Sequence, residues 1–335
     1  WPRGTAHGEG PVSDATTAIP SPDATGGQRL AAALVAGASW LVCRLPDALL
    51  HRLFDLLGAG HYLVNRRRRE LARRNLARGC GWRTERGRAA PRGARAASDP
   101  RALERMVRDV FRHHARYYLE VMRTTTFTDA YLARHLTFER QEHVDGLLEA
   151  PEEGVAGPLF VGLHFGSMEL PARYAVARAA RPVRTLQETL ANPVLHAWFS
   201  RQRAAVGLEI MDPAHALRPL VQRIRVGGIV ALVADRDLDG TGRRTELFGA
   251  PASLPVGPAL VAIEADVPAW AVAARRIGWT TYAVRLEPVE TPPPGHLRER
   301  VPAFLAAEAR AFERLVADAP EQWWTVLFPI WEEVA

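Results

Sequence analysis

The stretch PLFVGLHFGSMEL, residues 158–170, joins a run of apolar residues to a short polar turn. The apolar residues at 158–164 are typical of a strand that is buried on both faces. Gly166 and Ser167 end this strand, and residues 168–180 then have the composition of a helix. A strand that leads directly into a helix is the unit from which α/β folds are built.

The same alternation continues along the chain. Strands are predicted at 158–164, 183–188, 208–212, 228–235, 267–275 and 279–287, and helices at 101–123, 168–180, 193–206, 214–227 and 298–318. This order predicts an α/β fold with a central, mostly parallel sheet flanked by helices. Since no repeat or linker interrupts it, residues 101–335 are expected to form one α/β core.

The chain before this core divides into three parts. Residues 1–28 are rich in Gly, Pro, Ser and Thr without an apolar period, which predicts a disordered tail. Residues 29–78 are predicted to be helical, and the Arg- and Gly-rich residues 79–100 to be a flexible basic linker. We therefore expect a tail followed by a single domain over 29–335.

The predicted helices at 29–78 are unusually apolar. Residues 30–43 form a run of 14 uncharged residues, shorter than the ~20 that a spanning helix needs. In the segment 45–64, Leu49, Leu53 and Leu57 recur at helical spacing. Two interpretations stay open: the pair of helices caps the core, or it is an amphipathic hairpin that lies on a bilayer surface.

The charges are distinctive because all 43 basic residues are Arg, against 37 acidic residues and a net charge of +6. The absence of lysine excludes Schiff-base chemistry, and two cysteines are too few for a disulfide scaffold. Between residues 65 and 101, 13 Arg are accompanied by three acids. After an apolar hairpin, this block favours an anionic membrane surface as partner. A solvated charged segment and nucleic-acid binding are the alternatives, but Trp82 is the block's sole aromatic residue, so no nucleic-acid partner is expected.

His164 and Glu169 are the first candidate catalytic residues. They follow a predicted buried strand, and ligands of α/β sheets gather at the carboxyl ends of strands. An imidazole held by a carboxylate can take a proton from a hydroxyl, and free amides at the start of the next helix can stabilise an oxyanion. A buried structural histidine is the alternative. Ser167 lacks the Gly-x-Ser-x-Gly elbow of a serine hydrolase.

The segment ADRDLDG, residues 234–240, supplies the second group of candidates. Asp235 follows the most apolar strand of the chain and is placed to be a second carboxylate for His164. Arg236 or Arg203 is predicted to hold a phosphate or a carbonyl oxygen. Glu246 is a third acidic candidate of lower rank. An Asp–Arg pair that only holds a turn is the alternative, and no metal site is predicted.

The motif HFGSME at 164–169 resembles the His-x4-Asp/Glu motif of the lysophospholipid acyltransferase superfamily. Four further segments follow in the order seen in the branch that contains the lipid A late acyltransferases and the phosphatidylinositol mannoside acyltransferases. They are ANPVLHAWFSRQRAAVGLEI (191–210), ADRDLDG (234–240), ELFGAPASLPVGPALVA (246–262) and PEQWWTVLFPIWEE (320–333). The phosphatidylinositol mannoside enzymes are the closer match.

This resemblance implies a peripheral enzyme on the cytoplasmic face of the plasma membrane. It would transfer a fatty acyl group from acyl-CoA, a co-substrate rather than a cofactor, to a sugar hydroxyl of a membrane glycolipid such as a phosphatidylinositol mannoside. His164 would be the base, Glu169 the motif acid and Asp235 an acid that orients the base, with Arg203 near the donor or acceptor. The alternatives are an acyltransferase for lipid A or another lipid, and a non-catalytic membrane- or nucleic-acid-binding protein.

Overall fold

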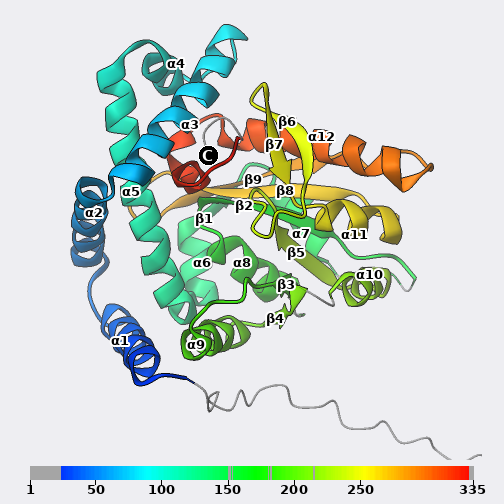
Figure 1. Cartoon of the computed structure of the whole chain (residues 1–335). Helices are drawn as coiled ribbons and strands as arrows, with labels where there is room; N and C mark the ends of the chain where they lie inside the picture. The colour runs from blue at the N-terminus through cyan, green and yellow to red at the C-terminus, as the bar shows by residue number, and fades with distance from the viewer. Residues whose placement is uncertain are drawn as a thin grey trace, which may run out of the picture.

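The computed structural model describes residues 24–331 except 150, 151, 153, 180, 182, 214 and 215, and within these residues seven strands form a central sheet (Figure 1). Their order across the sheet is β1-β9-β8-β2-β5-β3-β4. The strands are β1 (Leu136–Phe138), β2 (Leu159–Gly166), β3 (Val183–Leu186), β4 (Leu208–Met211), β5 (Ile229–Val233), β8 (Ala269–Arg276) and β9 (Tyr282–Val289). All neighbours run parallel except β8 and β9. The predicted α/β fold with a mostly parallel sheet is confirmed.

Strand β2 lies in the middle of the sheet, between β8 and β5. Its register pairs Leu159 with Val230 and Gly162 with Val233. His164 is near the end of β2, and Asp235 follows the end of β5 by two residues. Because parallel neighbours end at the same edge of a sheet, the two candidate segments meet there, as predicted.

Helices cover both faces of the sheet (Figure 1). From α6 on they are α6 (Asp129–His135), α7 (Gln141–Leu148), α8 (Glu169–Ala179), α9 (Pro193–Ala204), α10 (Leu217–Arg225), α11 (Gly257–Ala265) and α12 (Leu297–Val316). On one face, Phe160 of β2 is buried with Val144 of α7 and Ala175 of α8. On the other face, Val161 is buried in the large core that includes Phe304 of α12. Successive residues of β2 thus enter opposite cores, as the pleat of a strand requires.

The N-terminal helices form a layer beside the sheet. They are α1 (Gly26–Val42), α2 (Asp47–Val64), α3 (Arg66–Glu85), α4 (Pro91–Ser98) and α5 (Pro100–Arg123). In Figure 1, α1 and α2 run along the outer side of the molecule next to α5. Leu50 and Phe54 of α2 are buried against Leu119 of α5, so one side of α2 does cap the core. No helix in the described part of the chain is long and apolar enough to cross a membrane.

The predicted disordered tail needs correction at its end. Residues 1–23 lie outside the described residues. Residues 24–28 do not continue a tail, because α1 already begins at Gly26. The Gln28 amide donates to Thr25 Oγ1 at 3.2 Å and the Thr25 amide donates to Gln28 Oε1 at 2.9 Å. This reciprocal capping box supplies partners to amides that the helix itself leaves unpaired.

The predicted flexible linker at 79–100 is wrong, because most of this segment is helical. Helix α3 extends into it, and Pro91 begins α4 with a backbone angle that suits the first turn of a helix. Ala96 is buried in the main core. Arg92 forms ion pairs with Asp109 and, at 2.6 Å, with Glu321. The basic residues here therefore contact carboxylates as well as water.

A two-stranded hairpin, β6 (Arg243–Leu247) and β7 (Ala250–Leu254), lies outside the main sheet and was not predicted. Its turn residues Phe248 and Gly249 have φ values of 49° and 72°. Two-residue hairpin turns need such positive angles, and Asn-Gly is their usual sequence signal. Here the Phe248 ring packs against Trp82 and Trp323, with ring centroids 5.7 Å away in both cases. Burial of the ring offsets the unfavourable backbone angle.

Candidate active site

His164 and Asp235 form a hydrogen-bonded pair at the carboxyl edge of the sheet. The His164 Nδ1 atom lies 2.6 Å from Asp235 Oδ1, and the His164 backbone amide donates to Asp235 Oδ2 at 3.0 Å. A carboxylate can only accept, so Nδ1 carries the proton in the neutral ring and Nε2 has the free lone pair. The His164 side chain is 16% exposed, and no described residue is hydrogen-bonded to Nε2. Nε2 is therefore an accessible base.

A glycine next to this pair allows the close approach of two strands. Gly166, two residues after His164, has a φ of 55°, and a Cβ atom there would lie 1.9 Å from the carbonyl oxygen of Ala274 in β8. The Ser167 amide donates to the same carbonyl at 3.1 Å. The Ser167 amide is therefore already hydrogen-bonded and is not available to an oxyanion. This corrects the prediction of free oxyanion-binding amides at this one position. The amides in the first turn of α8 are the remaining candidates.

Asp235 is fully buried, and four donors surround its carboxylate. Two of the donors are the Nδ1 and the backbone amide of His164. The other two are Trp323 Nε1 and Thr325 Oγ1, which donate to Oδ2 at 2.7 and 2.6 Å. Burial alone would raise the pKa of this carboxyl, but the charge and hydrogen bond of His164, with those from Thr325 and Trp323, hold the pKa below its usual value. Asp235 stays ionised and can stabilise a protonated His164.

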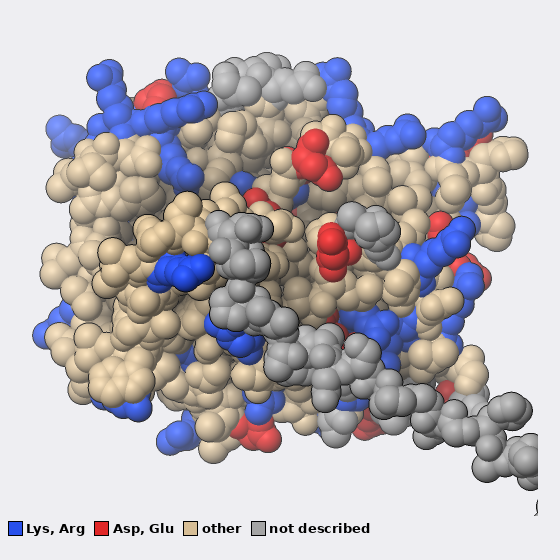
Figure 2. All heavy atoms as spheres, turned by 60° about the horizontal axis from the view of Figure 1, so that its bottom comes forward, with Lys and Arg blue, Asp and Glu red and all other residues tan. Residues whose placement is uncertain are grey.

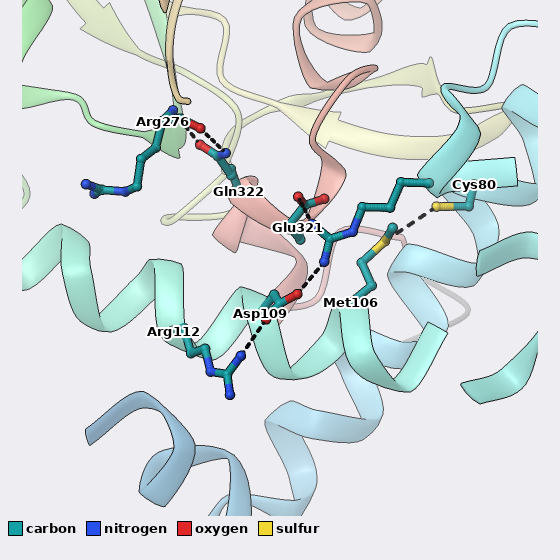
Figure 3. Close-up of polar contacts among 8 residues, drawn as sticks. Cys80, Met106, Asp109, Arg112, Arg276, Glu321 and Gln322 are labelled. Carbon is teal, nitrogen blue, oxygen red and sulfur yellow. Dashed lines mark hydrogen bonds and ion pairs between the residues drawn. The ribbon is translucent and has the colours of Figure 1, made fainter. Parts of the chain in front are cut away.

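The C-terminal segment that carries Trp323 and Thr325 is held by buried polar contacts (Figure 3). The side chain of Gln322 pairs with the backbone of Arg276 in β8, accepting at 2.7 Å and donating at 2.8 Å. The neighbouring Glu321 binds Arg92 of α4. These contacts fix the segment against the sheet and the N-terminal helices, so the two donors to Asp235 come pre-positioned.

Glu169 does not contact His164. It is 3% exposed at the start of α8, and its Oε1 accepts from Arg203 at 2.9 Å. Arg203 also donates to Gln187 at 3.0 Å. Burial alone would lower the pKa of the Arg203 guanidinium, but the Glu169 carboxylate and the Tyr117 hydroxyl raise it. Of the two predicted acids, Asp235 orients the histidine and Glu169 anchors an arginine.

Aromatic rings from two distant elements form a wall beside His164. The Trp324 ring meets the His164 ring edge-on, with centroids 4.4 Å apart. The rings of Tyr117 and His114 in α5 also pack on Trp324, with ring centroids 4.9 and 5.1 Å from that of Trp324. Burial, with positive charges that include His61 and Arg68, lowers the pKa of His114 to about 3. His114 is therefore neutral and serves in packing.

An apolar cavity of about 130 Å³ lies between the sheet and α8, and neither His164 nor Asp235 is among the described residues that line it. Its lining includes Leu163 and Phe165, which flank His164, and the polar residues Ser167, Glu169 and Arg203. The rest is almost entirely apolar and includes Val144, Leu148, Phe160, Ala172, Ala175, Ala231 and Leu286. The cavity can hold part of a hydrocarbon chain, whose burial is favourable in such surroundings.

Neither of the two remaining predicted site residues forms a hydrogen bond with His164. Arg236 is half-buried, and its guanidinium carbon lies 3.7 Å from the centre of the Phe328 ring. Glu246 is exposed on β6, where its charge acts on Glu313 of α12. The structure brings Glu246 to none of the other candidates. Within the described residues, no group of three or more His, Cys, Asp or Glu side chains is arranged to hold a metal ion.

The family model described as "Bacterial lipid A biosynthesis acyltransferase" matches residues 27–331. The chain belongs to this family. It is similar to the phosphatidylinositol mannoside acyltransferase of Mycobacterium tuberculosis, with 29% identity over 234 residues that cover 68% of this chain and 67% of the relative. The enzyme of the same name from Mycolicibacterium smegmatis is 27% identical over 233 residues, which cover 68% and 69%. The resemblance seen in the sequence motifs is confirmed.

Two residues that contact the His164–Asp235 pair were not singled out from the sequence. Trp323 and Thr325 each donate a hydrogen bond to the carboxylate of Asp235. Their one signal is the segment PEQWWTV, which entered the prediction only as part of the family resemblance. A local sequence pattern cannot predict a hydrogen bond between side chains that are 88 or 90 positions apart.

A buried carboxyl behind the site predicts how the stability of the acyltransferase depends on pH. Glu308 of α12 is 0% exposed, and neither of its oxygens has a hydrogen-bond partner in the described part of the chain. Burial and the charge of Asp235 raise the pKa of Glu308 well above 4.5. A carboxyl with a raised pKa in the folded state contributes stability at low pH, and this is lost as the pH rises from 4.5 towards the folded pKa.

We therefore expect Glu308→Gln to increase the free energy of unfolding above pH 4.5, with a gain of about 1.4 kcal/mol per pH unit up to the folded pKa. Urea unfolding between pH 4 and 8 measures this gain. Glu299→Gln, at an exposed position of the same helix, is the matched control and should leave the profile unchanged. Parallel profiles for wild type and Glu308→Gln would contradict the prediction.

Proposed function

We propose that the protein transfers a fatty acyl group from acyl-CoA to a sugar hydroxyl of a phosphatidylinositol mannoside. The observation that carries the proposal is the His164–Asp235 pair, with Nε2 of His164 free, near an apolar cavity whose lining includes Leu163 and Phe165, the chain neighbours of His164. The base suits a hydroxyl acceptor, and the cavity suits an acyl chain. The similarity to phosphatidylinositol mannoside acyltransferases supports the choice of acceptor.

In the proposed reaction, Nε2 of His164 removes the proton of the acceptor hydroxyl while its oxygen attacks the thioester carbonyl carbon. The new C–O bond forms and the C–S bond then breaks, so the electron pair leaves with the CoA sulfur. The imidazolium returns the proton to this thiolate. Asp235 stabilises the imidazolium, and amides in the first turn of α8 face the developing oxyanion. No acyl-enzyme forms on this route.

Part of the donor's acyl chain occupies the cavity, and Arg203 holds the thioester end. Arg203 is fixed by Glu169 and Gln187, so its direction at the cavity lining is set before substrate binds. Glu169 then acts as a positioning residue through Arg203. This assigns the motif acid a role in binding the donor, separate from the orientation of His164.

The test of the function is an incubation of purified protein with radiolabelled palmitoyl-CoA and defined acceptors. We expect label on a phosphatidylinositol mannoside and none on its phosphatidylinositol control. Transfer to a lipid A precursor instead would favour the second candidate, which the name of the matching family supports. Thioester hydrolysis without transfer to either lipid would contradict both.

The cavity predicts how chain-length preference can be changed. Ala175 of α8 is 8% exposed and lines the cavity, so Ala175→Leu places three more carbons in it. We expect the kcat/KM for palmitoyl-CoA to fall at least about tenfold relative to that for a shorter acyl-CoA, since a chain that no longer fits loses ~0.8 kcal/mol per displaced CH₂. Ala177→Leu, on the same helix but outside the cavity lining, is the control. An unchanged preference would contradict this placement.

A membrane surface is the proposed partner of α1 and α2. Large apolar side chains of both helices are exposed, among them Leu30, Leu34, Trp40, Leu41, Leu49, Leu53, Leu56, Leu57, Leu63 and Val64. We call this set the apolar surface. Figure 2 turns the lower side of Figure 1, where α1 lies, towards the viewer, and shows a largely tan face with basic side chains along its rim and several within it. Such a combination suits an anionic leaflet.

The basic residues near the apolar surface support this placement. Arg44 is exposed and stacks on Trp40, with its guanidinium carbon 4.0 Å from the ring centre. Arg66 and Arg67 are exposed directly after the end of α2. Each basic residue near an anionic surface contributes roughly 1 kcal/mol. Because the proposed donor is a cytoplasmic thioester, we place the protein peripherally on the cytoplasmic face of the plasma membrane.

We expect Leu34→Glu and Leu56→Glu each to weaken binding to vesicles of phosphatidylglycerol and phosphatidylcholine by about tenfold or more, because each removes one buried leucine from the bilayer contact. Co-sedimentation measures the binding. Val226→Glu, at a position 76% exposed on a different element, is the matched control. Equal binding by all three variants would show that the apolar surface does not meet the bilayer.

A further inference from the structure

Two arginines from distant parts of the chain share one aromatic ring. The guanidinium carbons of Arg68 in α3 and of Arg236 after β5 lie 4.3 and 3.7 Å from the centre of the Phe328 ring. All three side chains are half-buried. Within the described residues neither guanidinium forms an ion pair or hydrogen bond, and none of their nitrogens is both buried and unpaired. Their N–H groups therefore remain open to a ligand.

Several other half-buried arginines of the protein do have acidic partners. Arg116, Arg123 and Arg203 are similarly enclosed, and each binds a carboxylate within 3 Å. For Arg236, by contrast, burial lowers the pKa, the positive charge of Arg68 lowers it further, and the charges of Asp235 and Glu188 raise it. Neither carboxylate is within ion-pair distance. Two like charges held together without a counter-ion form a site for an anion.

The pair lies between the apolar surface and the catalytic base. Arg236 directly follows Asp235, and Phe328 packs on Trp324, which in turn packs on His164. On the other side, Arg68 lies four residues after Val64, which is 82% exposed at the end of α2. An anionic group bound here would be near the bilayer headgroups and one aromatic ring away from the reacting atoms.

We propose that Arg68 and Arg236 form a phosphate clamp that binds a phosphate ester of the substrates, with the Phe328 ring holding both guanidinium planes in place. The proposal rests on the proposed acyl transfer, in which both substrates carry phosphate esters: the acceptor a phosphodiester, and the donor the phosphates of CoA. The position next to the apolar surface favours the acceptor. Its phosphodiester lies at headgroup depth, and its sugar then extends towards His164.

The test measures binding and turnover separately. Isothermal titration of the full chain with glycerophosphoinositol, and separately with CoA, reports the clamp without any acyl transfer. We expect Arg68→Gln and Arg236→Gln each to weaken binding of one of these probes by about 10- to 100-fold, the loss of a charge-assisted pair. Arg298→Gln, at an exposed position on α12, is the charge-matched control.

The two sources of phosphate are then distinguished by which probe is affected. Weaker binding of glycerophosphoinositol, with a raised KM for the acceptor at an unchanged kcat, assigns the clamp to the acceptor. Weaker binding of CoA, with a raised KM for acyl-CoA, assigns it to the donor. Binding of both probes within twofold of wild type in Arg68→Gln, a variant of a residue on the outer helix layer, would overturn the proposal. Because binding is measured directly, a wild type that binds a probe but transfers no acyl group would refute the acyl transfer and not the clamp.

Discussion

Replacement of His164 by glutamine is expected to lower kcat for acyl transfer by about 10²- to 10⁴-fold, the usual contribution of a positioned general base. Glutamine can still donate to Asp235 through its amide, so the buried carboxylate keeps a partner. It cannot accept a proton at the position of Nε2. The variant therefore removes the chemistry with the least disturbance of the hydrogen bonds around Asp235. Initial rates with saturating palmitoyl-CoA and acceptor measure the effect.

His143→Gln is the control for the substitution itself. His143 lies in α7, packs on Trp270 and is not part of the His164–Asp235 pair. We expect it to retain the wild-type rate within about twofold, as for other substitutions outside a site. If His164→Gln also retained the wild-type rate, with the same unfolding midpoint, His164 would not be the base.

The second large effect is expected for Asp235→Asn, which should lower kcat by about 10³- to 10⁴-fold while the protein stays folded. An asparagine amide turned towards Nδ1 would place its donor where the histidine must donate. The ring would then take the other tautomer, with its proton on Nε2, and would lose its function as a base. The neutral amide could not stabilise the imidazolium either, because it carries no charge.

A comparison of kcat and KM with those of Glu169→Gln shows whether the effect of Asp235→Asn is specific to the His164–Asp235 pair. Glu169 binds Arg203 and does not reach His164, so its substitution should raise the KM for acyl-CoA more than it lowers kcat. Asp235→Asn should do the opposite. Equal losses of kcat in both variants would mean that the two acids share one role, contrary to the geometry.

The sheet could be predicted because its strands are short apolar runs between polar turns. The runs at 158–164 and 228–235 are buried β2 and β5, and their adjacency places His164 and Asp235 at one edge. The spacing from His164 to Glu169 did not decide which acid would face the ring. Glu169 begins α8 after a bend at Gly166, and its side chain is directed to Arg203.

Other features depend on tertiary contacts that leave no periodic signal. Residues 79–100 have a linker composition, yet Arg92 is bound by two carboxylates and Ala96 is buried, so the segment is helical. The hairpin of β6 and β7 turns at Phe248 rather than at an Asn-Gly pair. In both cases packing against distant side chains outweighs the local preference of the sequence.

The central claim is that His164, held by Asp235, activates an acceptor hydroxyl for direct attack on the thioester. A single-turnover experiment tests it most directly: excess protein is mixed with radiolabelled palmitoyl-CoA, with and without phosphatidylinositol mannoside, and quenched at successive times. We predict that label leaves CoA only when the acceptor is present, passes straight to the glycolipid, and does so at least about 10²-fold more slowly in His164→Gln. Label bound covalently to the denatured protein, or transfer at an equal rate in the variant, would contradict the account.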